Sequence, residues 1–320
     1  MHDVHVDSFA YSLGEQKIHV ADSAAAGKLR SEAEDLESAG FRWHHVCEPE
    51  TSPYELARGA TEQLARAGRL DDIDAIVYAT CIPLNANIGD SAAWERTRDV
   101  KHLMDFPAGR LQADFRLDDA VVMGLTQQAC TAMPGSIRLA GAMLLSEPAW
   151  RSVLCVTADR FPPGALYEQA YNLISDGGAA CVVSRRRSGF RLLASHQITN
   201  GALGQASDDE TVGAYFSYTH RVFTEAVARA GLTPADIDWV VPQNTSGKAW
   251  QILCRVLGVP FERVWCPSMP DVGHVISADN VVNLVQLVES GRLRPGQLLA
   301  VVMAGFGLNW QCLVLEAVGS

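Results

Sequence analysis

Cys130 is the residue whose surroundings most favour covalent chemistry. It stands in the segment QQACTA, between a strand-like apolar run at residues 120–125 and a second apolar run that is expected to form a helix. A cysteine beside a helix N-terminus meets unpaired N–H groups and the positive end of the macrodipole, which favour its thiolate form. The small neighbours Ala129, Thr131 and Ala132 leave room for a substrate. Cys130 is therefore a candidate nucleophile, whereas cysteines inside apolar runs are expected to be core thiols.

His274 and Asp279 form a candidate base and its orienting group. The run 274–289 is expected to be a long helix that opens with His274, so Cys130 and His274 would hold corresponding positions at two equivalent helices. A thiol beside an imidazole is the nucleophile–base arrangement of covalent acyl transfer. Asp279 is placed to orient the imidazole and to stabilise its cation. The competing interpretations are a hydrogen-bonded core histidine and a carboxylate that interacts only with the helix dipole.

A glycine-rich segment, GFGLNW, follows the apolar run at residues 298–304 and contains Gly307. Two glycines permit a tight turn that brings backbone N–H groups close to a ligand, as an oxyanion hole requires. An ordinary hairpin turn accounts for the same residues equally well.

An internal repeat supplies the elements that would position these residues. Residues 61–77 (TEQLARAGRLDDIDAIV) and 224–241 (TEAVARAGLTPADIDWVV) each read as a helix that ends at a glycine and leads into a short strand. Apolar runs at 152–158 and 298–304 each follow a long helix, in the same order in both copies. The pattern predicts a duplicated α/β unit with a mostly buried sheet in each half.

The join between the two halves is expected near residues 184–189. The N-terminal half, residues 1–184, would carry Cys130, and the C-terminal half, residues 185–320, would carry His274 and Gly307. If the halves pack about a pseudo-twofold axis, the N-termini of the two long helices face each other across one cavity.

Composition and charge exclude several classes of function. With 26 Lys and Arg against 37 Asp and Glu, the formal net charge is −11, which does not suit general nucleic-acid binding. No run approaches the ~18 apolar residues of a membrane helix, and no signal-peptide pattern is present. The eight cysteines contain no C-x-x-C pair, and no residues have metal-ligand spacing. We expect a cytoplasmic globular protein without a metal, a membrane or a nucleic-acid partner.

These motifs, in this order, resemble β-ketoacyl-ACP synthase III and its relatives in the thiolase superfamily. The resemblance runs from about residue 41 to residue 316 and is carried by the segments QQACTA, SDGGAACVV, VVPQN and AGFGLNW. It implies a five-layered αβαβα sandwich, usually a homodimer, that acts on acyl thioesters of CoA or acyl carrier protein. No permanently bound cofactor is implied, because the phosphopantetheine arm arrives with the acyl donor. Cys130 is then similar to the family's acyl-accepting nucleophile, and Gly307 to the donor that completes the oxyanion hole with the Cys130 N–H.

Two positions depart from the condensing members of this family. Those members carry His in the segment that here reads Pro-Gln243-Asn244-Thr, and Asn after the glycine that here is Gly273. This chain has amides at the first position and His274 at the second, an exchange that need not preserve the geometry for decarboxylating malonate. The pattern Gly-His-x₄-Asp resembles a subgroup from antibiotic pathways that transfers acyl groups with a Cys (or Ser), His, Asp set.

The resulting prediction is an acyltransferase that moves an acyl or aroyl group through Cys130 to a hydroxyl or amine of a small secondary-metabolite acceptor, without condensation. Gln243 or Asn244 would donate a hydrogen bond to the substrate. The alternatives are a ketosynthase III that condenses or loads a starter unit, and a catalytically silent partner of a ketosynthase. The basic tripeptide 185–187 is read either as a solvated turn or as a docking site for an acidic carrier protein.

Overall fold

The computed structural model describes residues 4–306 and 308–319. Over these residues the principal strands form a nine-stranded sheet in the order β11-β12-β13-β10-β1-β9-β6-β4-β5. The first half of the sheet contains β1 (His5–Leu13), β4 (Ile73–Ala79), β5 (Val121–Leu125), β6 (Ser152–Asp159) and β9 (Gly177–Ser184). The second half contains β10 (Phe190–Thr199), β11 (Trp239–Val241), β12 (Leu298–Gly305) and β13 (Asn309–Ala317).

The two halves of the sheet meet where β1 pairs with β10. The pairing is short, with His5 opposite Arg191 and Val6 opposite Phe190. Strand β1 pairs along most of its length with β9 instead. The sheet therefore divides into two parts that are joined by this short pairing, and the chain passes from one part to the other between β9 and β10.

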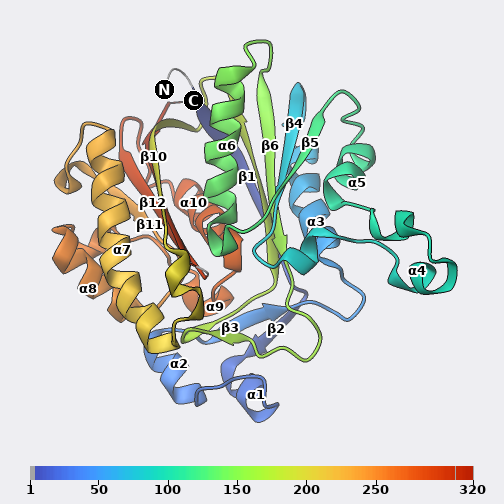
Figure 1. Ribbon diagram of the computed structural model, residues 1–320. Helices are drawn as coiled ribbons and strands as arrows, with labels where there is room; N and C mark the ends of the chain where they lie inside the picture. Colours follow the sequence, from blue (N-terminus) through green and yellow to red (C-terminus); the bar gives the residue numbers. More distant parts are fainter. Residues whose placement is uncertain (1–3, 307, 320) are drawn as a thin grey trace.

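Helices fill the space between the two parts of the sheet and cover both outer faces (Figure 1). The central core packs α6 (Ala132–Ser146) and α10 (Asp279–Glu289) between strands of both halves. A second core packs α3 (Pro53–Arg66) and α5 (Pro107–Asp114) on the outer face of the first half. A third packs α7 (Asp208–Arg229) and α8 (Gly247–Leu257) on the outer face of the second half. The layers thus run αβαβα, and the predicted fold class is confirmed.

Shorter elements complete the fold. The remaining helices are α1 (Val20–Ala25), α2 (Ala33–Ala39), α4 (Ser91–Thr97) and α9 (Met269–Val272), and two small ribbons pair β2 (Gln16–His19) with β3 (Trp43–Val46) and β7 (Glu168–Gln169) with β8 (Asn172–Leu173). Single 3₁₀ turns cover Pro83–Ala86, Val100–Leu103, Ala129–Thr131, Gly201–Gln205, Pro234–Asp236, Phe261–Arg263 and Ile276–Ala278. None of the helices in the described parts of the chain is long and apolar enough to cross a membrane.

The strands predicted in the two repeat units match the observed strands to within two residues at either end. The runs at 152–158 and 298–304 are β6 and β12, and both are almost wholly buried because helices cover both faces of the sheet. Helices α3 and α7 both lead to a glycine with positive φ, +64° at Gly68 and +74° at Gly231, as their sequences predict.

The expected helix at 274–289 is wrong at its start. Helix α10 begins at Asp279. Before it, α9 ends at Val272 and is followed by Gly273, whose φ of +63° and ψ of −156° suit only glycine. His274 is then extended and forms an isolated bridge with Ile174. His274 therefore lies five residues before Asp279, the first residue of helix α10.

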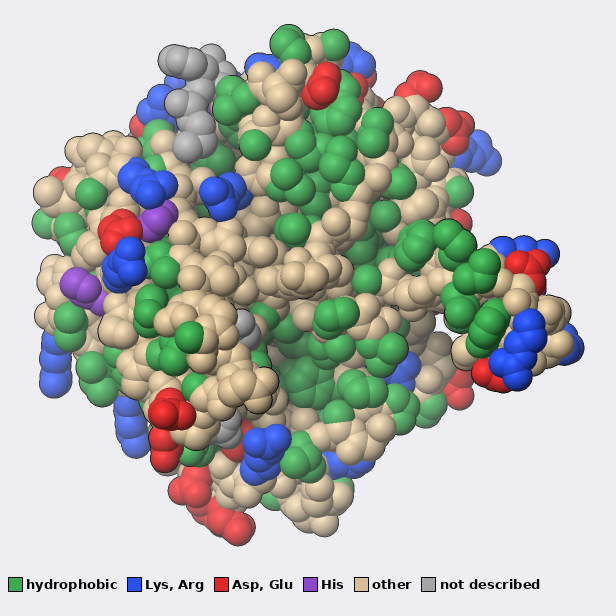
Figure 2. All heavy atoms as spheres, in the orientation of Figure 1, with side chains coloured by type: hydrophobic (Ala, Val, Ile, Leu, Met, Phe, Trp, Pro, Cys, Tyr) green, Lys and Arg blue, Asp and Glu red, His purple; other side chains and the backbone are tan. Residues whose placement is uncertain are grey.

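Residues 81–106 begin against the body, where Asn85 is buried, and then form an arm that carries α4 and projects from the body (Figures 1 and 2). Large apolar side chains remain exposed on it, with relative exposure of 67% at Leu84, 59% at Met104 and 52% at Phe106. The neighbouring edge strand β5 also exposes Val121 and Val122. These apolar surfaces are unusual for a side of the molecule that faces only water.

Candidate active site

Cys130 lies at a sharp turn between β5 and α6. The backbone turns there through positive φ at Gln127 (+65°) and Ala129 (+48°), a conformation that non-glycine residues rarely adopt. The end of β12 presses against this turn, because a Cβ at Gly305 would lie 2.9 Å from both Cys130 N and Gln128 O. The predicted position of Cys130, in a strand-to-helix turn ahead of a buried helix, is confirmed.

His274 is fixed from the opposite half of the molecule. Its backbone N–H donates to Leu173 O at 2.7 Å, and its carbonyl accepts from the Ser175 N–H at 2.9 Å. Gly273 makes this approach practicable, because a Cβ there would lie 2.7 Å from Leu173 O. A strand-like segment of the N-terminal half therefore holds the histidine of the C-terminal half.

Asp279 binds the imidazole from the side away from the cavity. Its Oδ2 lies 2.5 Å from His274 Nδ1 and also accepts from the Asn244 N–H at 2.8 Å. Its Oδ1 accepts from the Val275 N–H at 2.6 Å. The side chain is fully buried, and these donors fix its orientation. Nδ1 of His274 is consequently the protonated donor, and Nε2 is left for chemistry in the cavity.

The charges of the site favour a thiolate beside an imidazolium. The hydrogen bond between the Cys81 and Cys130 sulfur atoms, which lie 3.9 Å apart, is the main cause that lowers the pKa of Cys130, and His274 lowers it further against the opposing effect of burial. Burial by itself lowers the pKa of His274, but Asp279 and Cys130 outweigh it and raise that pKa. Cys130 and His274 thus stabilise each other's charged forms.

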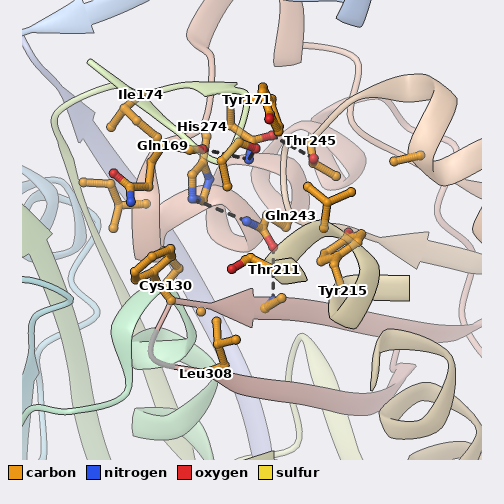
Figure 3. Close-up of a pocket in the computed structure, with 18 of the residues that line it drawn as sticks. Cys130, Gln169, Tyr171, Ile174, Thr211, Tyr215, Gln243, Thr245, His274 and Leu308 are labelled. Carbon is orange, nitrogen blue, oxygen red and sulfur yellow. Dashed lines mark hydrogen bonds between the residues drawn. The ribbon is translucent and has the colours of Figure 1, made fainter. Parts of the chain in front are cut away.

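The two amides Gln243 and Asn244 have different places. The Gln243 side chain lines the cavity, its Oε1 accepts from the Ala304 N–H at 3.1 Å, and its Nε2 lies 3.5 Å from His274 Nε2 (Figure 3). Asn244 is fully buried and does not line the cavity, because its amide donates to Gly273 O and accepts from Asn283. Gln243 therefore faces the site, and Asn244 supports the backbone beneath His274.

A cavity of about 450 Å³ opens over Cys130 and His274 (Figure 3). Its wall is mainly aromatic and aliphatic, and the larger apolar side chains are those of Phe161, Tyr215, Phe216, Ile252, Leu308 and Trp310. A polar pair, the Thr245 hydroxyl donating to Asn172 Oδ1 at 2.7 Å, stands on the same wall. The volume and lining suit an apolar acyl or aryl group with a polar end.

Sequence reasoning missed two residues that the fold brings to Cys130. Cys81 lies in the loop after β4 and lines the cavity, and Asp159 is the buried last residue of β6. Burial raises the pKa of Asp159 to about 7, against the backbone N–H groups that donate to it. The available signal was the topology, because β4, β5 and β6 are parallel and their carboxyl ends meet at one edge of the sheet.

The expected equivalence of Cys130 and His274 is corrected by the structure. The 3₁₀ turn Ile276–Ala278 precedes α10 as Ala129–Thr131 precedes α6, and Ile276 has the same φ of +48° as Ala129. The counterpart of Cys130 is therefore Ser277, whose hydroxyl donates to Ala129 O at 3.3 Å. His274 still reaches the site because its backbone is hydrogen-bonded to Leu173 and Ser175.

Gly307 and the basic tripeptide are two further features that the sequence singled out. Gly307 is outside the described residues. Arg185 donates to the carbonyl of Leu144 near the C-terminal end of α6, whereas Cys130 precedes the N-terminal end, so the basic tripeptide lies about 20 Å from the nucleophile. Among the residues that the structure describes, no group of three or more His, Cys, Asp or Glu side chains could hold a metal ion.

Comparisons with known proteins place this site in a family. Residues 126–201 match the model of 3-oxoacyl-[acyl-carrier-protein (ACP)] synthase III, and residues 227–317 match the model of its C-terminal part. The two regions together cover just over half of the chain and include Cys130, His274 and Asp279. The chain belongs to the 3-oxoacyl-[acyl-carrier-protein] synthase III family. It is thus a member of an enzyme family that belongs to the thiolase superfamily, as the resemblance implied.

Individual relatives of the synthase III family agree in sequence and fold. The β-ketoacyl-[acyl-carrier-protein] synthase III of Chlamydia caviae is 26% identical, over 82% of this chain and 81% of its own. The synthase III structure from Thermus thermophilus has a TM-score of 0.81 at 23% identity and covers 98% of this chain and 99% of its own. ChlB3, described as an acyltransferase, has a TM-score of 0.81 at 22% identity and covers 99% and 98%. At these identities the structural likeness shows a shared fold.

Proposed function

We propose that this protein is an acyltransferase that moves an acyl or aroyl group from an acyl-carrier-protein or CoA thioester to a hydroxyl or amine of a small acceptor, without decarboxylative condensation. The observation that carries the proposal is the bond from His274 Nδ1 to Asp279 at 2.5 Å, which leaves Nε2 facing the cavity beside Cys130. A base held in this way beside a nucleophile is suited to removing a proton from an acceptor.

In the first half-reaction the Cys130 thiolate attacks the thioester carbonyl carbon. A new C–S bond forms to Cys130, and the bond to the carrier sulfur breaks. The departing thiolate takes the Nε2 proton of the His274 imidazolium and leaves as a thiol. The products are an acyl-Cys130 enzyme, a neutral His274 and a free phosphopantetheine or CoA thiol.

In the second half-reaction the neutral His274 acts as the general base. Its Nε2 takes the proton of the acceptor hydroxyl or amine as the oxygen or nitrogen attacks the acyl-Cys130 carbonyl. The bond to Cys130 breaks, and the thiolate–imidazolium pair is restored as the ester or amide departs. General-base assistance of this kind contributes about 10²–10⁴-fold to the rate.

Gln243 supports this assignment as a hydrogen-bond donor. Since its Oε1 accepts from Ala304, its NH₂ group points towards His274 and the reacting carbonyl. The oxyanion of the tetrahedral intermediate would be held by the Cys130 N–H and, on the family resemblance, by Gly307, which lies outside the described residues. An amide cannot take up a proton as histidine does, so Gln243 would hold the substrate without exchanging protons with it.

Helix α8 offers the docking surface for an acidic carrier protein. Ala249 and Ile252 line the cavity, and Lys248 and Arg255 are exposed on the same helix. Positive side chains at the mouth of a pocket steer an acidic partner and place its prosthetic arm, although the whole protein is acidic. We include this surface in the proposal, with a phosphopantetheine arm passing α8 to reach Cys130.

Reversing the two charges on α8 tests this docking surface. Lys248→Glu with Arg255→Glu is expected to raise KM for an acyl-carrier-protein donor by about tenfold or more, because two attractive contacts become repulsive. KM for the same acyl group on a small pantetheine thioester should change little. The comparison is a steady-state assay with both donors at low and high salt. An equal effect on both donors would contradict docking at α8.

The proposal also includes a homodimer in the cytoplasm. The exposed apolar side chains of the arm at residues 81–106 and of the edge strand β5 offer a surface for a second copy of the chain. The reduced cysteines expected from the sequence agree with a cytoplasmic location. Both statements remain predictions.

Condensation is the second candidate function, because relatives in this family are named β-ketoacyl-[acyl-carrier-protein] synthase III. The two reactions separate in one experiment. Intact-protein mass spectrometry would follow acylation by a panel of carrier and CoA thioesters, and the acyl-enzyme would then be given hydroxyl or amine acceptors or a malonyl thioester. Acyl transfer predicts loss of the added mass with ester or amide formation and no CO₂. Release of CO₂ with a new C–C bond would establish condensation, and no adduct from any donor would favour a silent partner.

A further inference from the structure

Cys81 lies closer to the nucleophile than its place in the sequence suggests. It follows β4, whereas Cys130 follows β5, and the two Sγ atoms are 3.9 Å apart. Both side chains line the cavity. A thiol at this distance is within hydrogen-bonding range of a thiolate, and it is a donor only while it keeps its own proton.

The loop that carries Cys81 is held firmly by Asp159. The Cys81 N–H donates to both carboxylate oxygens at 2.9 and 3.0 Å, and the Ile82 N–H donates to Oδ1 at 2.9 Å. The Asn85 side chain adds a third donor at 3.1 Å. A carboxylate with several donors fixes the backbone around it, so the Cys81 thiol is presented to Cys130 in one position.

We propose that Cys81 is a positioning residue for the nucleophile, whose thiol donates a hydrogen bond to the Cys130 thiolate and keeps it ionised and aimed into the cavity. The proposal relies on the proposed function only in taking Cys130 as the reactive thiolate. It adds a second hydrogen-bond donor to the Cys130 sulfur, besides the His274 imidazolium.

The groups that face Cys130 from the surrounding elements agree with this role. From α10 and the segment before it come His274, which favours the thiolate, and Asp279, which opposes it. From the end of β6 comes Asp159, whose pKa is raised chiefly by burial and also by Cys130. The pKa of Cys81 is itself raised, chiefly by its hydrogen bond with Cys130 and then by burial, and His274 favours the thiolate at Cys130, so the proposal places the shared proton on Cys81.

Alkylation of Cys130 measures the thiolate without any acyl substrate. The test follows the rate at which iodoacetamide modifies the Cys130 peptide, by mass spectrometry under reducing conditions, as a function of pH. In Cys81→Ala we expect the midpoint of this profile to rise by about one pH unit, which slows modification about tenfold below the midpoint. In Cys81→Ser a hydroxyl donor remains, and the midpoint should stay closer to that of the unmodified protein.

The two variants separate donation from packing. An unchanged midpoint in Cys81→Ala would overturn the proposal, and so would equal shifts in the alanine and serine variants, because packing alone would then explain them. Should Cys81→Ala fail to fold, Cys81→Val removes the donor with a similar volume and serves the same comparison. Because no thioester is involved, a shifted midpoint in a protein that forms no acyl-enzyme would support this proposal while refuting the transferase.

Discussion

Replacing Cys130 with alanine is expected to abolish the acyl-enzyme and to lower acyl transfer by about 10⁴–10⁶-fold, the range seen when a covalent enzyme loses its nucleophile. The physical reason is that the base His274 then has no thiolate to act with, and the donor thioester must be attacked directly by the acceptor. The measurement is intact-protein mass spectrometry after exposure to the preferred donor, followed by a transfer assay.

A second cysteine supplies the matched control for this variant. Cys254 is a buried residue of α8 in the C-terminal half and does not line the cavity. Cys254→Ala should therefore keep both the added mass and most of the transfer rate. An adduct that persists in Cys130→Ala, mapped to another residue, would contradict the assignment of the nucleophile.

Asp279→Asn is expected to cost about 10⁴-fold in kcat/KM while leaving the fold intact. The carboxylate accepts from His274 Nδ1 and from the backbone N–H groups of Asn244 and Val275. An asparagine amide has one oxygen, so it cannot accept hydrogen bonds at both positions. Its NH₂ group faces either His274 Nδ1 or the backbone N–H groups. The imidazole then changes tautomer or turns away from Cys130. Losses of this size follow when the orienting carboxylate of such a set becomes an amide.

The pH profile gives this variant its distinctive signature. In the unmodified protein acylation should rise with pH through the lowered pKa of Cys130 and fall above the raised pKa of His274, because the thiolate–imidazolium pair exists only between them. Without the Asp279 charge the pKa of His274 falls, so the alkaline limb should move to lower pH. Asp271→Asn, which changes a half-exposed carboxylate within α9, should leave the profile unchanged. An unmoved alkaline limb in Asp279→Asn would argue against the proposed role.

The strands and the position of Cys130 were predictable because their signals are local. Strands β6 and β12 are continuous apolar runs bounded by turn residues, and Cys130 sits between a strand pattern and a helix pattern. The repeated helix–glycine–strand motif then indicated the layered architecture. The strands and the position of Cys130 needed only the neighbouring dozen residues, and the architecture needed only the comparison of two segments.

The position of His274 was not predictable from the repeat. Its segment is set by contacts with Leu173 and Ser175, about a hundred residues earlier in the chain, and by a Gly273 conformation that no periodicity reveals. The choice between Gln243 and Asn244 was hidden for a similar reason. It depends on which amide finds partners in the core, and Asn283 and the Gly273 carbonyl supply them to Asn244.

The main element that the sequence analysis missed is the strand β1. No element was assigned to residues 5–13, although they form β1, which pairs with β9 on one side and briefly with β10 on the other. Their pattern, HVDSFAYSL, is too mixed to show a buried strand. Its pairing partners, in residues 177–191, belong to a distant part of the sequence.

The place of β1 also determines how this protein must be built during synthesis. Residues 5–13 leave the ribosome well before their partner β9, which is complete only when residue 184 has been made. At a translation rate of about 5–20 residues per second, the strand waits for roughly ten to thirty seconds without a partner. Neither part of the sheet can close around the central helices in that interval, so the nascent chain depends on protection of an unpaired strand until its middle has emerged.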